Sequence, residues 1–493
     1  MPPRDGSTEE DLSVFNQCSP RGYICVVLCF PCDDSRRADA THHIKQSLAR
    51  LAEDRPLFAG RLYTTSEGRV VLRQSKFYDI PFRVIPNEDG QELDYEELKR
   101  REFPPDTFIR PRYGIPGLTV PNCRLFPGLT EYDCRLFPDL ADHDCGLFPV
   151  SKVDITFARG GLLLSIFLQH AITDGGSLEI FLKSFGNQTR NTLESLPSDQ
   201  KLRIPRPILS SRKLSETSTF RRLVKKCPEY EILLDFSGPT QPRMLPGGQP
   251  ISSLNKIGKI FVFTTDSLRK LRETIRAKNR SNERPTAYTS LAALAVAHIT
   301  RARISTEPRL SGIEPGHHAA LWNSVNWRKR AFDGATSNYF GNAVLPAVTK
   351  IPREHVNAAC DDDGHLAHLV PLIKESINEV DEDYVRERMS MMAAAPDPRM
   401  VGVNYDPRSP EVLAFNTWRH FGADAQWDIP GVPVTKPDAI RRATGAFGLG
   451  TALILPARGD SNKQELFVSL SVDAMEALCQ DQRWMKWVDR IIG

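Results

Sequence analysis

The clearest hydrophobic pattern in the chain is a run of apolar or small residues, Leu162–Leu168, followed by a short polar turn. A short run of this kind is typical of a strand that is buried on both faces. Apolar residues then recur at helical spacing and predict a helix over Ser177–Phe185, for which Thr173 or Asp174 is a suitable N-cap. His170 is therefore expected where a buried strand ends and a turn begins.

The same two patterns, short apolar runs and apolar residues at helical spacing, recur along the rest of the chain. In the first half, a helix over Ala38–Leu51 lies between a strand over Tyr23–Phe30 and a hairpin over Leu62–Arg73. Strands and helices also alternate in the second half. The strands expected there are 259–264, 321–326, 412–418, 451–456 and 465–471, and the helices are 267–277, 291–300 and 474–488. The stretch 354–386 is expected to be mainly helical.

The length of 493 residues exceeds what one hydrophobic core normally holds, so we expect two domains. A polar stretch with three prolines, from Gly186 to Thr219, is typical of a linker. The predicted division is an N-terminal lobe, 1–185, a linker, 186–220, and a C-terminal lobe, 221–493.

Composition excludes several classes of protein. Apolar residues make up 40% and charged residues 25%, as in soluble globular proteins, and the net charge of +3 gives no basic footprint for nucleic acid. No apolar stretch reaches the ~18 residues that a membrane span requires. The N-terminus lacks the apolar core of a signal peptide, and the ten cysteines are irregularly spaced. We therefore expect reduced thiols and a cytoplasmic location.

His170 and Asp174 form a His-x-x-x-Asp pattern that is suited to proton transfer. A histidine with an ordinary pKa of ~6.5 exchanges a proton near neutral pH, and a positioned general base contributes about 10²–10⁴-fold. Gly175 and Gly176 allow the backbone to turn sharply after the pair. The alternative is a core histidine at a strand end; the preceding strand and the following helix start favour a functional side chain.

Two groups of cysteines need an explanation. Cys25, Cys29 and Cys32 have the spacing that radical enzymes use for a four-iron cluster with S-adenosylmethionine. Cluster ligands converge from a loop, whereas the first two of these cysteines lie in a predicted strand, so we expect buried free thiols.

The second group belongs to an eleven-residue repeat with copies at Cys123, Cys134 and Cys145. Three proline-rich copies are too few for a solenoid and predict a duplicated loop before the strand Lys152–Ala158. His143 lies near the last copy, but no Cys-x2-Cys pair is present, so we expect no metal site.

Four basic residues follow the predicted linker: Arg221, Arg222, Lys225 and Lys226. Such a cluster usually forms a solvated face. The alternative is a site for a nucleotide phosphate.

Several segments of the chain stand in a characteristic order. They are Pro56–Leu62, His170–Gly175, Val325–Arg328, Tyr339–Asn342, Asn416–Trp418 and the final strand and helix over Leu466–Trp487. In this order they resemble the BAHD superfamily of CoA-dependent acyltransferases, and most of all its fungal branch, which includes the trichothecene O-acetyltransferases. The resemblance implies an α/β fold of two lobes, like chloramphenicol acetyltransferase. Each lobe is then a mixed β-sheet with flanking helices, and an active-site tunnel runs between the lobes.

The segment Asp428–Pro437 departs from the family pattern. The family carries Asp-Phe-Gly-Trp-Gly there, soon followed by Lys-Pro, and this chain keeps the Asp, one Gly and the Lys-Pro. The family's loop is structural, so the departure concerns donor-side geometry more than chemistry.

The resemblance also implies roles for individual residues. His170 takes the proton of the acceptor hydroxyl and returns it to the CoA sulfur. The indole N–H of Trp418, helped by the hydroxyl of Thr417, stabilises the oxyanion. Asp174 supports the site structurally by pairing with an arginine, for which Arg328 is the candidate.

The expected reaction is O-acyl transfer, with acetyl as the expected acyl group, to a small-molecule alcohol of secondary metabolism. Acyl-CoA serves as co-substrate, with no bound cofactor and no metal. The expected partners include no nucleic acid and no membrane, and we expect a monomer. The acyl donor, the acceptor and the residues that bind the CoA phosphates are not specified by the sequence.

Two other functions share the His-x-x-x-Asp-Gly pattern. A condensation-like module forms amides on carrier proteins, but it has a second histidine where this chain has Gln169. A non-catalytic binding protein of the same fold is favoured only by the altered segment Asp428–Pro437.

Overall fold

The computed structural model describes residues 7–86, 93–109, 147–192, 217–233, 256–278, 284–307, 317–332, 339–404, 409–442 and 449–493. Two features expected from the sequence fall outside these ranges. They are the eleven-residue repeat with its candidate zinc ligands, up to residue 146, and most of the linker, residues 193–216.

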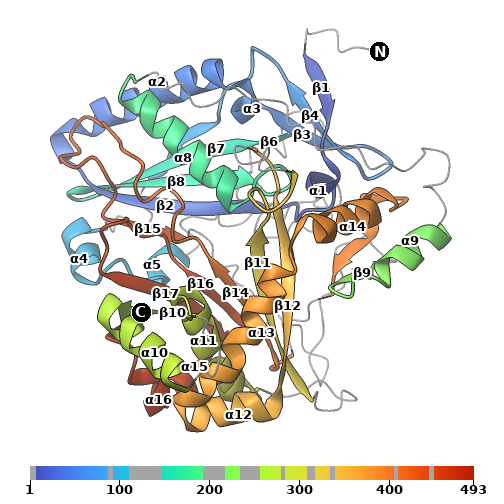
Figure 1. The fold of residues 1–493 in the computed structure, drawn as a ribbon. Coiled ribbons are helices and arrows are strands. Elements are labelled where there is room, and N and C mark those ends of the chain that lie inside the picture. Colours follow the sequence, from blue (N-terminus) through green and yellow to red (C-terminus); the bar gives the residue numbers. More distant parts are fainter. Residues whose placement is uncertain are drawn as a thin grey trace.

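The sheet that leads to His170 has five strands in the order β15-β2-β8-β7-β5 (Figure 1). At its centre is the predicted apolar run, observed as β8, in which every residue is buried. β8 runs antiparallel to both neighbours and pairs Gln169 with Tyr23, whereas β5 is parallel to β7, so the sheet is mixed. The strands are β2 (Tyr23–Pro31), β5 (Phe82–Val84), β7 (Ser151–Ala158), β8 (Gly161–Gln169) and β15 (Ala439–Arg442).

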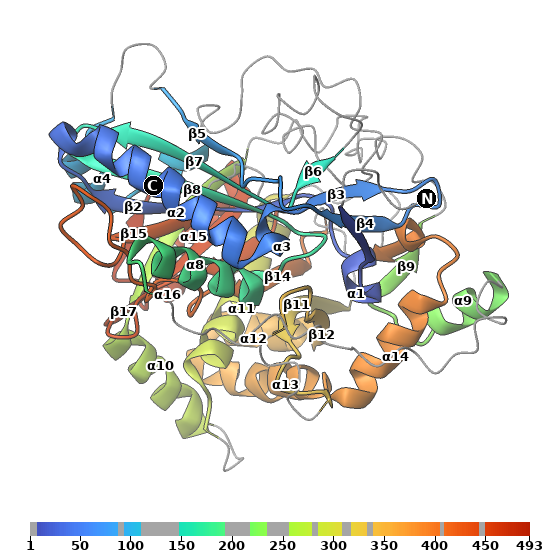
Figure 2. The same cartoon turned by 90° about the horizontal axis from the view of Figure 1, so that it is seen from above.

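Helices cover both faces of this sheet. Two long helices lie side by side on one face and bury Ile44 and Phe181 against strand residues such as Ile166 (Figures 1 and 2). Two short helices cover the other face with Tyr95 and Phe108. These helices are α2 (Arg37–Asp54) and α8 (Gly175–Thr189) on the first face and α4 (Tyr95–Arg100) and α5 (Asp106–Ile109) on the second.

The alternation of side chains along β2 separates the three cysteines that a cluster would need. Cys25 and Cys29 are buried under α4 and α5, whereas Cys32 belongs to the core on the other face. Burial raises the pKa of Cys29 to about 12, so this thiol stays protonated at neutral pH. The prediction of buried free cysteines is confirmed.

The second large sheet has seven strands in the order β12-β11-β14-β16-β17-β10-β18. β14 is parallel to β11 and β16, and the other pairs are antiparallel, so this sheet is mixed as well. Its strands are β10 (Lys256–Thr264), β11 (His318–Asn326), β12 (Val344–Pro352), β14 (Val412–Thr417), β16 (Thr451–Ile454), β17 (Lys463–Ser471) and β18 (Arg490–Ile492).

The core beneath the seven-stranded sheet is centred on α11, in which Thr289 to Thr300 are all buried. The stretch 354–386, expected to be mainly helical, contains three α-helices. Asp362 caps a 3-10 turn between the first two, and Asp381 caps the third. Within the described ranges, no helix combines the length and the apolar character needed to cross a membrane. The helices are α10 (Thr265–Lys278), α11 (Ala287–Thr306), α12 (Arg353–Asp361), α13 (Leu366–Asn378), α14 (Glu382–Ala393), α15 (Val472–Gln480) and α16 (Gln482–Met485).

Smaller elements complete the fold. The predicted hairpin is confirmed as β3 and β4, which belong to a four-stranded sheet of order β1-β4-β3-β6, and β9 pairs with β13. Their bounds are β1 (Thr8–Asp11), β3 (Arg61–Thr64), β4 (Val70–Gln74), β6 (Phe148–Pro149), β9 (Tyr230–Ile232) and β13 (Val401–Val403), and the short helices are α1 (Val14–Gln17), α3 (Pro56–Ala59) and α9 (Thr217–Val224).

The two halves of the chain share a sheet. β15 comes from the second half but pairs with β2, with Arg442 opposite Val26. In addition, α8 continues to Thr189, past the expected lobe boundary at 185. Within it, Gly186 packs against the second half of the chain, where a Cβ would lie 2.4 Å from the carbonyl oxygen of Gln426. The division at 1–185, 186–220 and 221–493 stays a prediction.

Candidate active site

The backbone around His170 is fixed at the end of β8. The His170 N–H donates to the carbonyl of Gly22 at 2.7 Å, and Asn342 Nδ2 donates to the His170 carbonyl at 2.7 Å. The buried side chain of Gln169 bonds the carbonyl of Arg21 and the N–H of Ala171. Gln169 therefore supports the turn, and His170 is held from both sides.

As a residue, His170 is partly exposed, in contrast to the buried strand before it. Its Nδ1 atom is buried and has no hydrogen-bond partner among the described residues. Burial lowers the pKa of His170 below its ordinary 6.5; Arg442 adds to this lowering, and the negative charge of Asp174 opposes it. The imidazole is consequently neutral at pH 7, the form that can accept a proton.

Asp174 pairs with Arg328, as predicted, and its carboxylate does not bond the imidazole. Arg328 Nη1 and Nη2 donate to the two carboxylate oxygens at 2.8 and 2.7 Å, and the backbone N–H groups of Ser177 and Ala343 donate at 2.9 and 2.8 Å. Burial alone would raise the pKa of Asp174, but Arg328 and these N–H groups outweigh it and lower that pKa. The carboxylate is therefore charged and fully bonded.

The guanidinium of Arg328 also binds the turn that follows β11. It donates to the carbonyls of Tyr339 at 2.9 Å and Gly341 at 2.6 Å. Gly176 must lack a side chain here, because a Cβ would lie 2.7 Å from Arg328 Nη1. The ion pair thus ties the start of α8 to the 339–343 turn of the other lobe.

Trp418 follows directly after β14 and is 8% exposed. Its backbone N–H donates to the carbonyl of Ile454, and the guanidinium of Arg442 lies over its ring at 5.3 Å. Arg442 is also the positive charge that lowers the pKa of His170. Arg442 thus links the surroundings of the two predicted site residues, although no motif or pattern in the chain had pointed to it.

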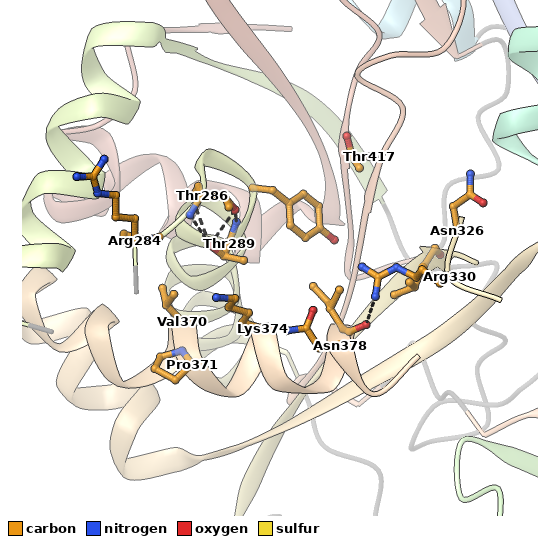
Figure 3. Close-up of a pocket in the computed structure, with 15 residues that line it drawn as sticks. Arg284, Thr286, Thr289, Asn326, Arg330, Val370, Pro371, Lys374, Asn378 and Thr417 are labelled. Atoms are coloured by element: carbon orange, nitrogen blue, oxygen red, sulfur yellow. Dashed lines mark hydrogen bonds between the residues drawn. The ribbon is translucent and has the colours of Figure 1, made fainter. Parts of the chain in front are cut away.

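A pocket of 340 Å³ opens in the C-terminal half, between the start of α11, the face of α13 and the ends of β11 and β14 (Figure 3). Basic, hydroxyl and apolar side chains line it together. Among them are Arg284, Thr286, Tyr288, Asn326, Arg330, Pro371, Lys374 and Thr417.

The pocket connects to the residues described above at two points. Thr417 precedes Trp418, and its hydroxyl accepts a bond from the N–H of Arg419. Asn326 Oδ1 accepts from the backbone N–H of Arg328 at 3.0 Å. His170, Asp174, Arg328 and Trp418 themselves do not line this pocket, and of its lining residues only Thr417 had been assigned a site role from the sequence.

The remaining sequence candidates lie elsewhere. Arg221, Arg222, Lys225 and Lys226 are exposed on and just after α9, as expected of a solvated face, and none of them lines this pocket. The altered segment 428–437 packs on the N-terminal half: the N–H of Asp33 donates to the carbonyl of Gly431 at 2.8 Å. This contact fits the structural role implied for the segment.

Comparison with known proteins agrees with this architecture. The family model described as "Transferase family" matches residues 134–485. The eremophilane O-acetyltransferase ORF8 of Penicillium roqueforti (strain FM164) is 21% identical over 431 residues, which cover 82% of this chain and 84% of that protein. The trichothecene 8-O-acetyltransferase of Fusarium sporotrichioides is 22% identical over 354 residues, 67% of this chain and 70% of that protein.

Solved structures agree on the fold. F. graminearum TRI101, complexed with Coenzyme A and T-2 mycotoxin, superposes with a TM-score of 0.72 at 18% identity and covers 99% of this chain and 100% of that chain. Vinorine synthase superposes with a TM-score of 0.58, also at 18% identity. The predicted α/β fold, with two mixed sheets flanked by helices, is confirmed.

Proposed function

The chain belongs to the Transferase family and is an acyltransferase, and we propose that it moves an acetyl group from acetyl-CoA to a hydroxyl of a small secondary metabolite. The observation that carries the proposal is the geometry around His170. His170 is partly exposed at the end of β8, and the Asp174 carboxylate is bound by Arg328 and does not hold the imidazole. Burial lowers the pKa of His170, which favours the neutral form that can accept a proton from a bound alcohol.

In the proposed reaction, His170 Nε2 accepts the hydroxyl proton while the acceptor oxygen bonds to the thioester carbonyl carbon. We assign the transfer to Nε2 because Nδ1 is buried. The tetrahedral intermediate then breaks its C–S bond, and the imidazolium returns the proton to the CoA sulfur. The enzyme needs no nucleophile of its own, because a thioester is already activated.

The oxyanion of that intermediate needs a donor, and we assign this role to the indole N–H of Trp418, with Thr417 as a second candidate. One preorganised donor is worth about 2.7–4 kcal/mol. The position of Trp418 after β14, beside the pocket residue Thr417, supports this assignment.

We propose that the 340 Å³ pocket receives the CoA arm. Arg284, Arg330 and Lys374 supply positive charge for phosphates, and Thr286 caps the positive end of the α11 dipole beside them. Apolar lining such as Pro371 suits the pantetheine chain. Asp174 is a positioning residue in this scheme, because it acts through Arg328 and the start of α8.

Release of free thiol from acetyl-CoA in the presence of a panel of alcohols tests the proposal. We expect His170→Ala to lower kcat by about 10²–10⁴-fold. The matched control is His318→Ala. His318 is an exposed histidine at the start of β11, whereas Asn326 lies at the other end of the strand, so this variant should leave kcat unchanged. Equal thiol release by His170→Ala and the wild type would exclude His170 as the base.

The same assay separates the other functions. A condensation-like enzyme would acylate amines in preference to alcohols, and a non-catalytic binder would bind acetyl-CoA without releasing thiol.

We also propose a fungal source and a monomer that works in the cytoplasm. Every cysteine in the described ranges is a free thiol, in keeping with a reducing compartment, and size-exclusion chromatography with light scattering tests the monomer.

A further inference from the structure

The short helix α1 carries two buried amides, Asn16 and Gln17, at 4% and 3% exposure. α1 lies between the small N-terminal sheet and α14, at the seam of the two halves (Figures 1 and 2). Asn16 is 326 residues away in sequence from its hydrogen-bond partner, Asn342. No motif or periodicity in the sequence pointed to either amide of α1.

The side-chain oxygen of Asn16 organises Asn342. Asn16 Oδ1 accepts from the backbone N–H of Asn342 at 2.7 Å and from Asn342 Nδ2 at 3.1 Å. The same Nδ2 donates to the carbonyl of His170 at 2.7 Å. An amide nitrogen has two hydrogens, and in this arrangement one points to Asn16 and the other to His170.

The acceptor on Asn16 therefore sets the orientation of the Asn342 amide. If that amide turned over, its oxygen would face two other oxygens, those of Asn16 and His170, and the bond to His170 would be lost. Removal of the Asn16 oxygen takes away one of the two acceptors that favour the observed orientation and leaves the His170 carbonyl alone to hold it.

We propose that Asn16 is a positioning residue for His170, which acts through the amide of Asn342 to hold the peptide carbonyl of the base. The inference rests on the proposed function of His170. Asn16 does not line the pocket, and it reaches His170 through Asn342, whose amide bonds the His170 carbonyl and also lies close enough to the imidazole to act on its pKa. A displacement of about 1 Å in a reacting group can cost about 10²-fold in rate.

Other hydrogen bonds also hold the turn that carries Asn342, so an effect on the position of His170 can be distinguished from an effect on folding. Gly341 N–H donates to Ser177 Oγ at 2.9 Å, and Ala343 N–H donates to Asp174 Oδ2 at 2.8 Å. Because both neighbours stay attached to α8, loss of Asn16 should leave the turn in place and free only the amide between them.

The test compares substitutions in wild-type background by kcat, by KM for acetyl-CoA and by melting temperature. Asn16→Leu keeps the size of the side chain but removes the acceptor, and we expect kcat to fall about 10–100-fold while KM stays within twofold. Asn16→Asp keeps an acceptor oxygen for both N–H groups, so we expect its kcat to be at least tenfold higher than that of Asn16→Leu.

Gln17→Leu is the matched control. Gln17 lies in the same helix and is equally buried, but its two hydrogen bonds go to the backbone of Val70 in β4, at 2.7 and 2.8 Å. We expect Gln17→Leu to lower the melting temperature as much as Asn16→Leu and to keep kcat within threefold of the wild type.

Three results would overturn the inference: kcat within threefold of wild type in Asn16→Leu, an equal loss of kcat in Gln17→Leu, or no recovery in Asn16→Asp. Failure of the proposed function would look different, because the wild type itself would then release no thiol with any acceptor. An active wild type that loses activity in His170→Ala but not in Asn16→Leu rejects this inference alone.

Discussion

Two strand ends contribute to the proposed site, and they are built in different ways. At the end of β8, hydrogen bonds hold His170 on both sides of its backbone. At the end of β14, Trp418 is held mainly by packing, with its indole buried and Arg442 over the ring. The comparison teaches that the base depends on polar atoms in fixed geometry, whereas the indole depends on shape. Substitutions that keep shape but remove polar atoms should therefore affect the two ends differently.

The largest expected effect comes from the ion pair behind the β8 end. Asp174→Ala leaves Arg328 buried without its partner, and we expect a loss of about 3–5 kcal/mol in the free energy of unfolding, measured by urea denaturation. The control is Glu179→Ala on the same helix, which removes the partly exposed partner of Lys183 and should cost less than about 1 kcal/mol. A loss from Asp174→Ala as small as the control's would refute the supporting role.

The β14 end should respond in activity and not in stability. Trp418→Phe keeps a ring beneath Arg442 but removes the N–H, so we expect kcat to fall about 10²–10³-fold with a nearly unchanged melting temperature. Trp427→Phe is the control, because Trp427 is buried against Phe30 and Phe185 and its N–H has no partner among the described residues. Full activity in Trp418→Phe would leave the indole a packing residue only.

The pocket should respond in donor binding. Lys374→Met and Arg284→Met each remove a positive charge from the lining, and we expect KM for acetyl-CoA to rise about tenfold or more with kcat unchanged. The KM of the wild type for acetyl-CoA should also rise with salt concentration, and the KM of the variants should rise less steeply. Lys436→Met, which removes a partner of Asp424 outside the pocket, should change neither constant.

The smallest effect sharpens the link between the two ends. Burial lowers the pKa of His170, and the positive charge of Arg442 lowers it further. We therefore expect kcat/KM to fall on acidification only when the pH drops below that pKa, which lies under 6.5. Arg442→Gln removes a positive charge that disfavours the imidazolium, so the kinetic pKa should rise and the loss of activity on acidification should begin at a higher pH. A kinetic pKa that falls, or that does not move, would show that Arg442 does not act on the base.

Local pattern was enough to predict the β8 end. The apolar run fixed the strand, the Asp-Gly-Gly-Ser start fixed the helix, and Asp174 is its N-cap as expected. Its partner Arg328 came from the order of motifs, since nothing near Asp174 in the sequence points to a residue 154 positions away.

The rest of the site could not be predicted because its members converge only after folding. The pocket draws lining from α11, α13, β11 and β14, and no short segment contains its pattern. Asn16 and Arg442 are ordinary residues locally and gain their importance from partners on other elements. The break between α13 and α14 has a local signal in Asp381, which caps α14.

The shared sheet has a consequence for how this protein can be cut and expressed. Because β15 pairs with the outer side of β2, a fragment that ends at residue 220 would leave β2, with Val26 and Leu28, as an unpaired apolar edge strand. Unpaired edge strands of this kind pair with other chains and lead to aggregation. Separately produced halves should therefore be insoluble alone and should be recovered only when they are synthesised together.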